Sequence, residues 1–115
     1  MPGSSGAGVR AGVRRSAPIF AALGDETRLR IVVRLSRNGP LSIAELTADE
    51  RVTRQAVTKH LQRLASAGVL RSRRFGRERR WEVEPAALDA AENHLRAISA
   101  EWDAALARLK AFVER

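Results

Sequence analysis

The chain contains no cysteine among its 115 residues. Disulfide bonds, thiolate metal sites and cysteine nucleophiles are therefore excluded. Long apolar runs are also lacking, since none approaches the roughly 20 residues that span a bilayer, and the amino terminus lacks the apolar stretch of a secretory signal. From the sequence we expect a cytoplasmic protein with no membrane partner.

Aromatic residues are scarce, with only three Phe and two Trp. Because hydrophobic residues still make up 44% of the chain, the core must be built from Leu, Val, Ile and Ala. Cores of this composition are usually helical, and the length suits one domain. The sequence has no Ser/His/Asp set, phosphate-binding loop or metal-hydrolase motif. We therefore expect no enzymatic activity and no cofactor.

Positive charge is concentrated in the middle of the chain, whose formal net charge is +8. Residues 51–80 hold ten basic side chains and one acidic, whereas residues 1–50 hold seven and five, and residues 81–115 hold four and seven. A solvated surface is rarely so one-sided. A concentrated basic segment is typical of proteins that bind a polyanion, most often nucleic acid.

The residue pattern divides the chain into three parts. Residues 1–15 hold four of the eight glycines and no periodic apolar pattern, which predicts a disordered basic arm. Residues 16–84 show helical periodicity followed by two short β-compatible runs, and we interpret them as one domain. Residues 85–115 predict a single long helix.

Capping signals predict four short helices in the central domain. Asp25 and Thr53 are suitable N-caps, and Ser42 with Glu45 has the form of a capping box. The predicted helices span residues 16–24, 25–38, 42–47 and 53–67. The residues predicted to face inward are Ile19, Phe20 and Leu23 in the first helix, Leu29, Ile31, Val32 and Leu35 in the second, and Val57, Leu61 and Leu64 in the fourth.

Two short runs, residues 70–75 and 79–83, follow the fourth helix. They predict a β-hairpin that turns at Gly76, with Trp81 and Val83 facing the core. The final helix begins at Pro85 and carries apolar residues at nearly heptad spacing.

That helix is too long and too apolar on one face for so small a domain, so we expect a homodimer. The predicted interface residues are Ile19, Phe20, Leu95, Ile98, Trp102, Leu106 and Leu109.

These elements predict a mostly α fold with a small β-hairpin wing, that is, a winged helix-turn-helix with a long C-terminal dimerisation helix. The fourth helix has an apolar back and a polar front, as a helix in the major groove of double-stranded DNA requires. Arg54 is suited to guanine and Gln55 to adenine. Arg77 at the wing tip is suited to the DNA backbone or the minor groove. The other predicted DNA contacts are Thr53, Thr58, Lys59, His60 and Arg63 on the helix and Arg74 and Arg79 on the wing.

Four short motifs support a more specific interpretation: LGDETRLRI at residues 23–31, LSIAEL at 41–46, VTKHLQRL at 57–64 and AGVL at 67–70. With these motifs the chain resembles the ArsR family of bacterial transcriptional regulators over roughly residues 17–84. The resemblance implies a dimeric winged-helix repressor that binds a palindromic operator, commonly upstream of its own operon. The similarity is greatest to the cysteine-free branch of the family, which has no recognised metal site.

Metal sensing is the first alternative. The family's arsenic and cadmium sensors place a Cys pair in the third helix, where this chain has Ile43 and Ala44. Other members bind zinc between their C-terminal helices through His and carboxylate ligands. The corresponding helix here offers His94 as its only histidine, with Asp89, Glu92, Glu101 and Asp103. We therefore predict no metal site and a solvated or interface position for His94.

Three questions stay open at this point. A metal- or small-molecule-responsive sensor of the same fold is an alternative, and the sequence does not identify its effector. A winged helix that binds RNA or protein is a further alternative, although few aromatic residues are present to stack on unpaired bases. For His60 we expect either a local hydrogen bond that supports its helix or a phosphate contact.

Overall fold

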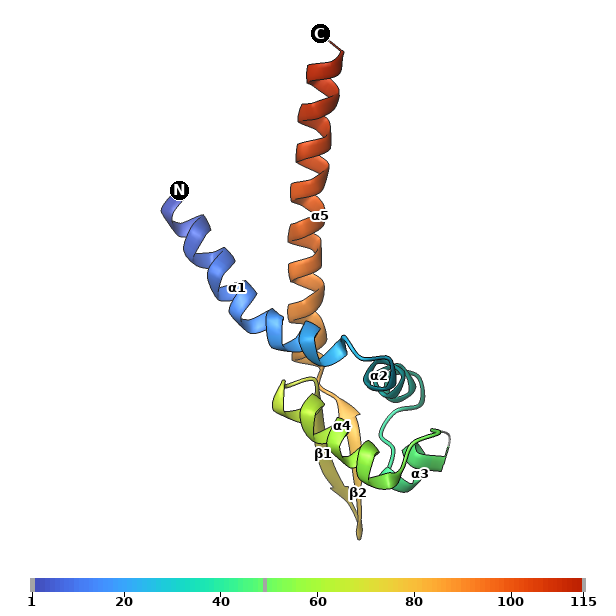
Figure 1. Ribbon diagram of the computed structural model, residues 1–115. Helices are drawn as coiled ribbons and strands as arrows, with labels where there is room; N and C mark the ends of the chain where they lie inside the picture. The colour runs from blue at the N-terminus through green and yellow to red at the C-terminus, as the bar shows by residue number, and fades with distance from the viewer. Residues whose placement is uncertain (1, 49, 115) are drawn as a thin grey trace.

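The computed structural model describes residues 2–48 and 50–114, and for residues 2–9 it describes the backbone alone. Its elements are α1 (Pro2–Leu23), α2 (Glu26–Asn38), α3 (Ile43–Ala48), α4 (Arg54–Ser66), β1 (Leu70–Phe75), β2 (Glu78–Val83) and α5 (Pro85–Val113). α2, α3, α4 and the hairpin gather at one end, while α1 and α5 extend away from them and diverge (Figure 1). The predicted mostly α fold with a hairpin wing and a long final helix is confirmed.

The helix starts follow from their caps. The Asp25 carboxylate accepts the backbone N–H of Arg28 at 3.0 Å. Ser42 and Glu45 exchange two bonds, since the Ser42 N–H donates to Glu45 Oε1 at 3.1 Å and the Glu45 N–H donates to Ser42 Oγ at 3.2 Å. Thr53 Oγ1 accepts the Ala56 N–H at 3.1 Å. Each bond satisfies an N–H that the first helical turn leaves without a partner, so the predicted caps are confirmed.

The core lies where α2, α3 and α4 meet the hairpin, the end of α1 and the start of α5. All three residues predicted to face inward from α4, namely Val57, Leu61 and Leu64, are fully buried. Burying such a side chain contributes about 1.5–3 kcal/mol. This stripe therefore fixes the rotation of α4 and directs the opposite face to solvent.

The inner face of α2 differs from the prediction. Leu29, predicted to face inward, is 47% exposed, whereas Arg28 is buried at 9%. Nε of Arg28 donates to the carbonyl oxygen of Ala22 at 2.6 Å. The prediction for Leu29 is wrong because a guanidinium with its own hydrogen-bond acceptor occupies the inner position beneath the end of α1.

α1 is longer than the sequence predicted. It begins at Pro2, so residues 2–15 are helical where a disordered arm was expected, and Met1 lies outside the described residues. α1 packs against α5 at Gly12, where an added Cβ would lie 3.8 Å from His94 Nδ1. Ser16, further along the same helix, is 2% exposed. Contact with α5 supplies a packing surface that the amino-terminal sequence does not reveal by itself.

The hairpin is fastened to the domain by its second strand. Leu41 and Trp81 exchange two backbone hydrogen bonds of 3.1 and 2.8 Å. Trp81 and Val83 pack against the core, as predicted. The turn contains Gly76 at φ 64°, a left-handed conformation that favours glycine.

Candidate nucleic-acid interface

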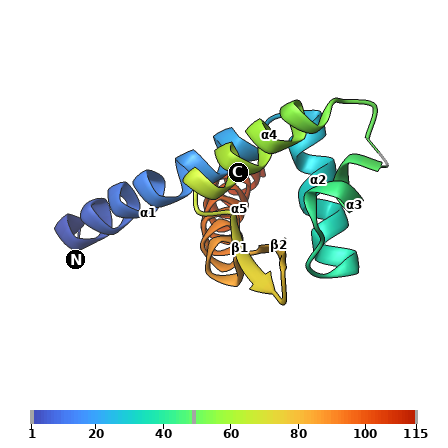
Figure 2. The ribbon, with the colours of Figure 1, turned by 90° about the horizontal axis from the view of Figure 1, so that it is seen from below.

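α4 and the tip of the hairpin lie at the end of the molecule opposite the C-terminus of α5 (Figure 1). The view from below shows α4 crossing the domain with the hairpin beside it (Figure 2). The face of α4 turned away from the core carries the exposed side chains of Gln55, Lys59 and Arg63, and Arg54 is exposed in the first turn of the helix. Within the described residues, none of these cations forms an ion pair with the chain's own carboxylates. This face therefore presents uncompensated positive charge.

The two threonines predicted to contact DNA also have structural roles. Thr53 Oγ1 accepts the capping bond at the start of α4, which leaves its hydroxyl hydrogen free to donate elsewhere. Thr58 Oγ1 donates to the carbonyl oxygen of Arg54 at 2.9 Å, so its oxygen can act only as an acceptor while that bond is made.

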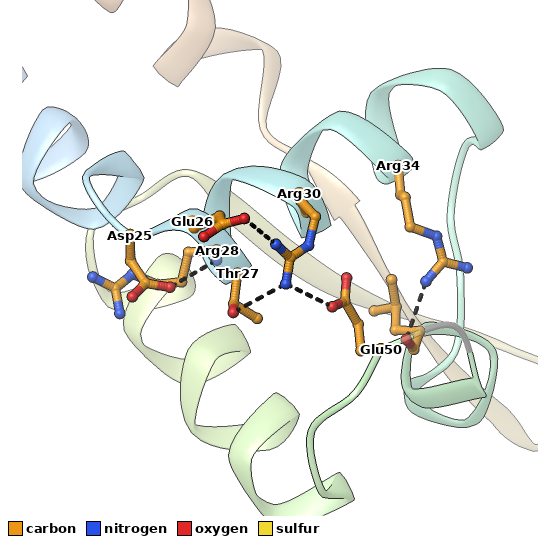
Figure 3. A network of polar contacts seen from close by, with 8 residues as sticks. Asp25, Glu26, Thr27, Arg28, Arg30, Arg34 and Glu50 are labelled. Carbon is orange, nitrogen blue, oxygen red and sulfur yellow. Dashed lines mark hydrogen bonds and ion pairs between the residues drawn. The ribbon is translucent and has the colours of Figure 1, made fainter.

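The turn that precedes α4 is tied to α2. Arg30 donates to Glu26 at 2.8 Å and to Glu50 at 3.2 Å, and Glu50 lies shortly before α4 (Figure 3). Arg34 donates to the carbonyl oxygen of Leu46 at 3.0 Å, at the end of α3. These contacts join α2 to the end of α3 and to the turn that follows it.

His60 has a partner that sequence reasoning missed. Arg28 Nη1 lies 3.4 Å from His60 Nδ1, in a half-buried position between α2 and α4. This contact agrees with the first of the two roles considered for His60, a local hydrogen bond that supports its helix. The only sequence signal for Arg28 was a basic residue three positions after the Asp25 cap, within an otherwise apolar stripe.

The wing arginines fall into two groups because directly paired residues of an antiparallel hairpin share a face. The pairs Arg71–Glu82, Arg73–Arg80 and Phe75–Glu78 share one face. There Glu82 accepts from Arg71 Nε and Arg73 Nε, each at 2.7 Å, and Glu78 pairs with Arg80 at 3.3 Å. The guanidinium groups of Arg73 and Arg80 also lie 5.1 and 5.2 Å from the centre of the Phe75 ring. Much of the positive charge on this face is neutralised internally.

The other face of the hairpin carries Arg74 and Arg79, which are paired across the strands two positions beyond Trp81. Arg79 Nη1 donates to Ser72 Oγ at 2.7 Å. In the part of the chain that the structure describes, Arg74, Arg79 and the turn residue Arg77 have no carboxylate partner. Like charges placed directly opposite each other destabilise a hairpin. A bound anion would remove that repulsion.

A second exposed surface, distinct from α4 and the wing, runs along α5. Only Ala87 and Ala91, near its start, are buried. The predicted interface residues beyond them form an exposed apolar seam, with exposed fractions from 38% for Ile98 to 65% for Trp102; the seam consists of Leu95, Ile98, Trp102, Leu106 and Leu109. Beside it, the diverging α1 and α5 enclose a groove of about 740 Å³. Its apolar lining includes Val13, Ala90 and Ile98.

The two predicted interface residues of α1 differ in position. Ile19 is only 5% exposed because it belongs to the chain's own core, so it is removed from the proposed dimer surface. Phe20 is half-buried, and its ring centre lies 6.1 Å from that of His94. His94 therefore lies between α1 and α5 and is not fully solvated.

Among the described residues, no group of three or more His, Asp or Glu side chains is arranged to hold a metal ion. None of the helices within residues 2–48 and 50–114 combines the length and apolar character needed to cross a membrane.

Two carboxylate side chains at helix starts, Asp25 and Glu45, make the stability of the protein depend on pH. The backbone N–H of Arg28 lowers the pKa of Asp25 below its ordinary 3.8, and the backbone N–H of Ser42 lowers the pKa of Glu45 below its ordinary 4.5. A carboxylate with a lowered folded-state pKa stabilises the protein above its unfolded pKa, and that contribution is lost as the pH falls. We expect the melting temperature to stay constant from neutral pH down to about pH 5 and to decrease as the pH falls below 5.

The Asp25→Asn variant is the control for this prediction. Asparagine also caps helices but does not titrate, so its melting temperature should fall less between about pH 5 and pH 3. If the melting temperatures of the two proteins fell by the same amount across this pH range, the Asp25 cap would not contribute to the pH dependence of stability.

Comparisons with known proteins agree with this geometry. A protein-family model described as a helix-turn-helix domain matches residues 23–73. The chain is 45% identical over 67 residues to YuzN, an uncharacterized HTH-type transcriptional regulator of Bacillus subtilis, covering 53% of this chain and 73% of the relative. It is 33% identical over 67 residues to the arsenical resistance operon repressor of Escherichia coli, covering 58% of this chain and 57% of the repressor.

A solved structure of an ArsR-like transcriptional regulator from Rhodococcus sp. RHA1 is also similar. It superposes with a TM-score of 0.76 at 39% identity, covering 86% of this chain and 92% of that chain. The similarity therefore extends beyond the helix-turn-helix to most of the molecule.

Proposed function

The chain belongs to the ArsR family of winged helix-turn-helix transcriptional regulators, and from this premise we propose that it is a homodimeric repressor of a palindromic DNA operator. α4 is the recognition helix and lies in the major groove, and the wing follows the adjacent backbone. The family consists of regulators rather than enzymes, so no catalysis is assigned. Because its target is DNA, we propose that it acts in the cytoplasm.

The distribution of ion pairs carries this proposal. Acidic partners neutralise Arg71, Arg73 and Arg80 on one face of the wing. Arg74, Arg77 and Arg79, like the cations of α4, have no such partner within the described residues. Unpaired guanidinium groups on a groove-sized helix and an adjacent hairpin match the phosphates that flank a major groove.

The exposed seam of α5 supports the dimer. A helix that leaves a large side chain such as Trp102 65% exposed is marginal without a partner surface. A second copy presents the same seam, and a two-fold axis between the two α5 helices buries both. The resulting pair of α4 helices would read half-sites about one DNA turn apart, roughly 34 Å. Similarity to the Escherichia coli repressor supports repression over activation.

The direct test is selection of bound duplexes from a random-sequence pool by the full chain. We expect a motif with two-fold symmetry whose half-sites lie about 10–10.5 base pairs apart or a multiple of that spacing. Enrichment of no motif, or of an asymmetric single site, would contradict the proposal.

Base readout is tested with Arg54→Ala and Gln55→Ala. Each variant should lose about 1–3 kcal/mol of binding free energy on the selected site and should relax the base preference at one position of each half-site. Arg37→Ala is the matched control, since Arg37 is an exposed arginine on α2, away from α4. If the Arg54→Ala and Arg37→Ala variants had the same affinities for the selected site and for sites with a substituted base pair, α4 would not be the element that reads the bases.

A further inference from the structure

Arg28 connects three helices at the inner edge of the proposed DNA-binding surface. Its side chain is 9% exposed. Nε donates to the Ala22 carbonyl in the last turn of α1, and Nη1 lies 3.4 Å from His60 Nδ1 on α4. Its backbone N–H donates to the Asp25 carboxylate at the start of α2 (Figure 3). One guanidinium on α2 thus contacts both α1 and α4.

The chemistry of this contact fixes the state of the histidine. A guanidinium only donates hydrogen bonds and keeps its charge in proteins. Nδ1 of His60 must therefore be the acceptor, which requires a neutral ring whose single N–H is on Nε2. The bond to Arg28 is incompatible both with the other neutral tautomer and with a doubly protonated ring.

The surroundings of His60 point to a use for that N–H. His60 is half-exposed on α4 and follows the exposed Lys59, with the exposed Arg63 one turn further on. The charged groups near it on α2 are the guanidinium of Arg28 and the carboxylate of Asp25. A phosphate oxygen only accepts hydrogen bonds, so a ring held with its hydrogen on Nε2 is prepared to donate to one.

We propose that Arg28 is a positioning residue for DNA binding: it holds His60 as the neutral Nε2–H tautomer and so presents a fixed hydrogen-bond donor to a DNA phosphate. The phosphate contact rests on the proposed function. The tautomer does not, because it follows from the contact between Arg28 and His60 alone.

The first test is the ring ¹⁵N spectrum of His60 in the free wild-type protein at neutral pH. The chain has two histidines, so a His94→Gln variant assigns both sets of signals. We expect the Nε2–H tautomer for His60. An Nδ1–H tautomer, or rapid exchange between the two, would overturn the proposal whether or not the protein binds DNA.

The second test uses Arg28→Met, which keeps an apolar stem and removes every donor. We expect loss of the single tautomer and about a tenfold or greater loss of affinity for the selected operator. Arg37→Met is the matched control, since Arg37 is an exposed arginine on the same helix. It should leave both the His60 spectrum and the affinity unchanged. Circular dichroism establishes that both variants are folded, and if Arg28→Met does not fold, Arg28→Lys replaces it.

A rescue separates positioning from simple packing. Glutamine carries an amide nitrogen close to the place of histidine Nε2, so His60→Gln should retain more operator affinity than His60→Ala. Equal losses in these two variants, or unchanged affinity in Arg28→Met despite a changed tautomer, would refute the phosphate contact while the wild-type operator complex still supports the proposed function. If wild-type protein binds no operator at all, the proposed function fails and the phosphate contact fails with it.

Discussion

Replacing both Trp102 and Leu106 by glutamate is expected to produce a monomer whose affinity for a two-fold operator is lower by about a hundredfold or more. These side chains are 65% and 56% exposed in the single chain, so their substitution leaves the folded domain intact. In the proposed dimer they would be buried, and burying unpaired carboxylates costs several kcal/mol. A monomer holds only one half-site at a time and so loses the combined affinity of two linked sites.

Light scattering and operator titration measure this effect, and circular dichroism establishes that α5 is still helical. The control replaces Glu92 and Arg96 by glutamine, because these residues form an ion pair with each other on α5 outside the apolar seam. That double variant should remain a dimer with unchanged operator affinity. If the Trp102 and Leu106 double variant also remained a dimer with full affinity, the assignment of the α5 seam would be wrong.

The Arg74→Ala/Arg79→Ala double variant is expected to weaken binding to operator and scrambled DNA alike and to flatten the salt dependence. Because each of the two subunits would then neutralise two fewer phosphates, the slope of log K against log salt should fall by about three to four. The matched control is Arg71→Ala/Arg73→Ala, which removes the same charge from a position where Glu82 and Glu84 already neutralise it. Its slope should change much less.

The comparison between these two variants is decisive because their net charges are equal. A general attraction between a basic protein and DNA predicts the same change in slope for both. The structure predicts a larger change in slope for Arg74→Ala/Arg79→Ala. Arg74 and Arg79 lie opposite each other without a carboxylate partner among the described residues, whereas Arg71 and Arg73 both pair with Glu82. Equal slopes in anisotropy titrations at several salt concentrations would therefore remove the wing from the interface.

Local signals were sufficient to predict the helix-turn-helix. The caps at Asp25 and Thr53 depend on side chains within three residues of the bonds they make, so their meaning is contained in a short stretch of sequence. The buried stripe of α4 repeats at helical spacing, which predicts both the rotation of the helix and its outward face.

The features that were missed depend on partners distant in the sequence. Arg28 is buried because Ala22 and His60 satisfy it from two other helices, and no apolar periodicity reveals such partners. That burial moves Leu29 to the surface. Ile19 belongs to this chain's core and not to the dimer because of how α1 meets the rest of the domain.

The pairing register of the two hairpin strands determines which wing arginines have acidic partners, which composition alone does not show. Six arginines lie within residues 71–80, and their number alone does not separate those that face a glutamate from those that do not. The antiparallel pairing does so, because it puts Glu82 between Arg71 and Arg73 and places Arg74 against Arg79. The predicted choice of Arg74, Arg77 and Arg79 matches the group without carboxylate partners in the described chain.

The central claim is that two α4 helices and two wings read one operator, and the most direct measurement is fluorescence anisotropy of the full chain with three probes. The probes are the duplex upstream of its own gene, a scrambled duplex and a stem-loop RNA, each titrated at several salt concentrations with and without zinc. We predict tight binding to the upstream duplex with two chains per duplex, and weaker, more salt-dependent binding to the other two. Equal and steeply salt-dependent binding to all three probes would contradict the account, because it would reduce the site to a basic surface without sequence recognition.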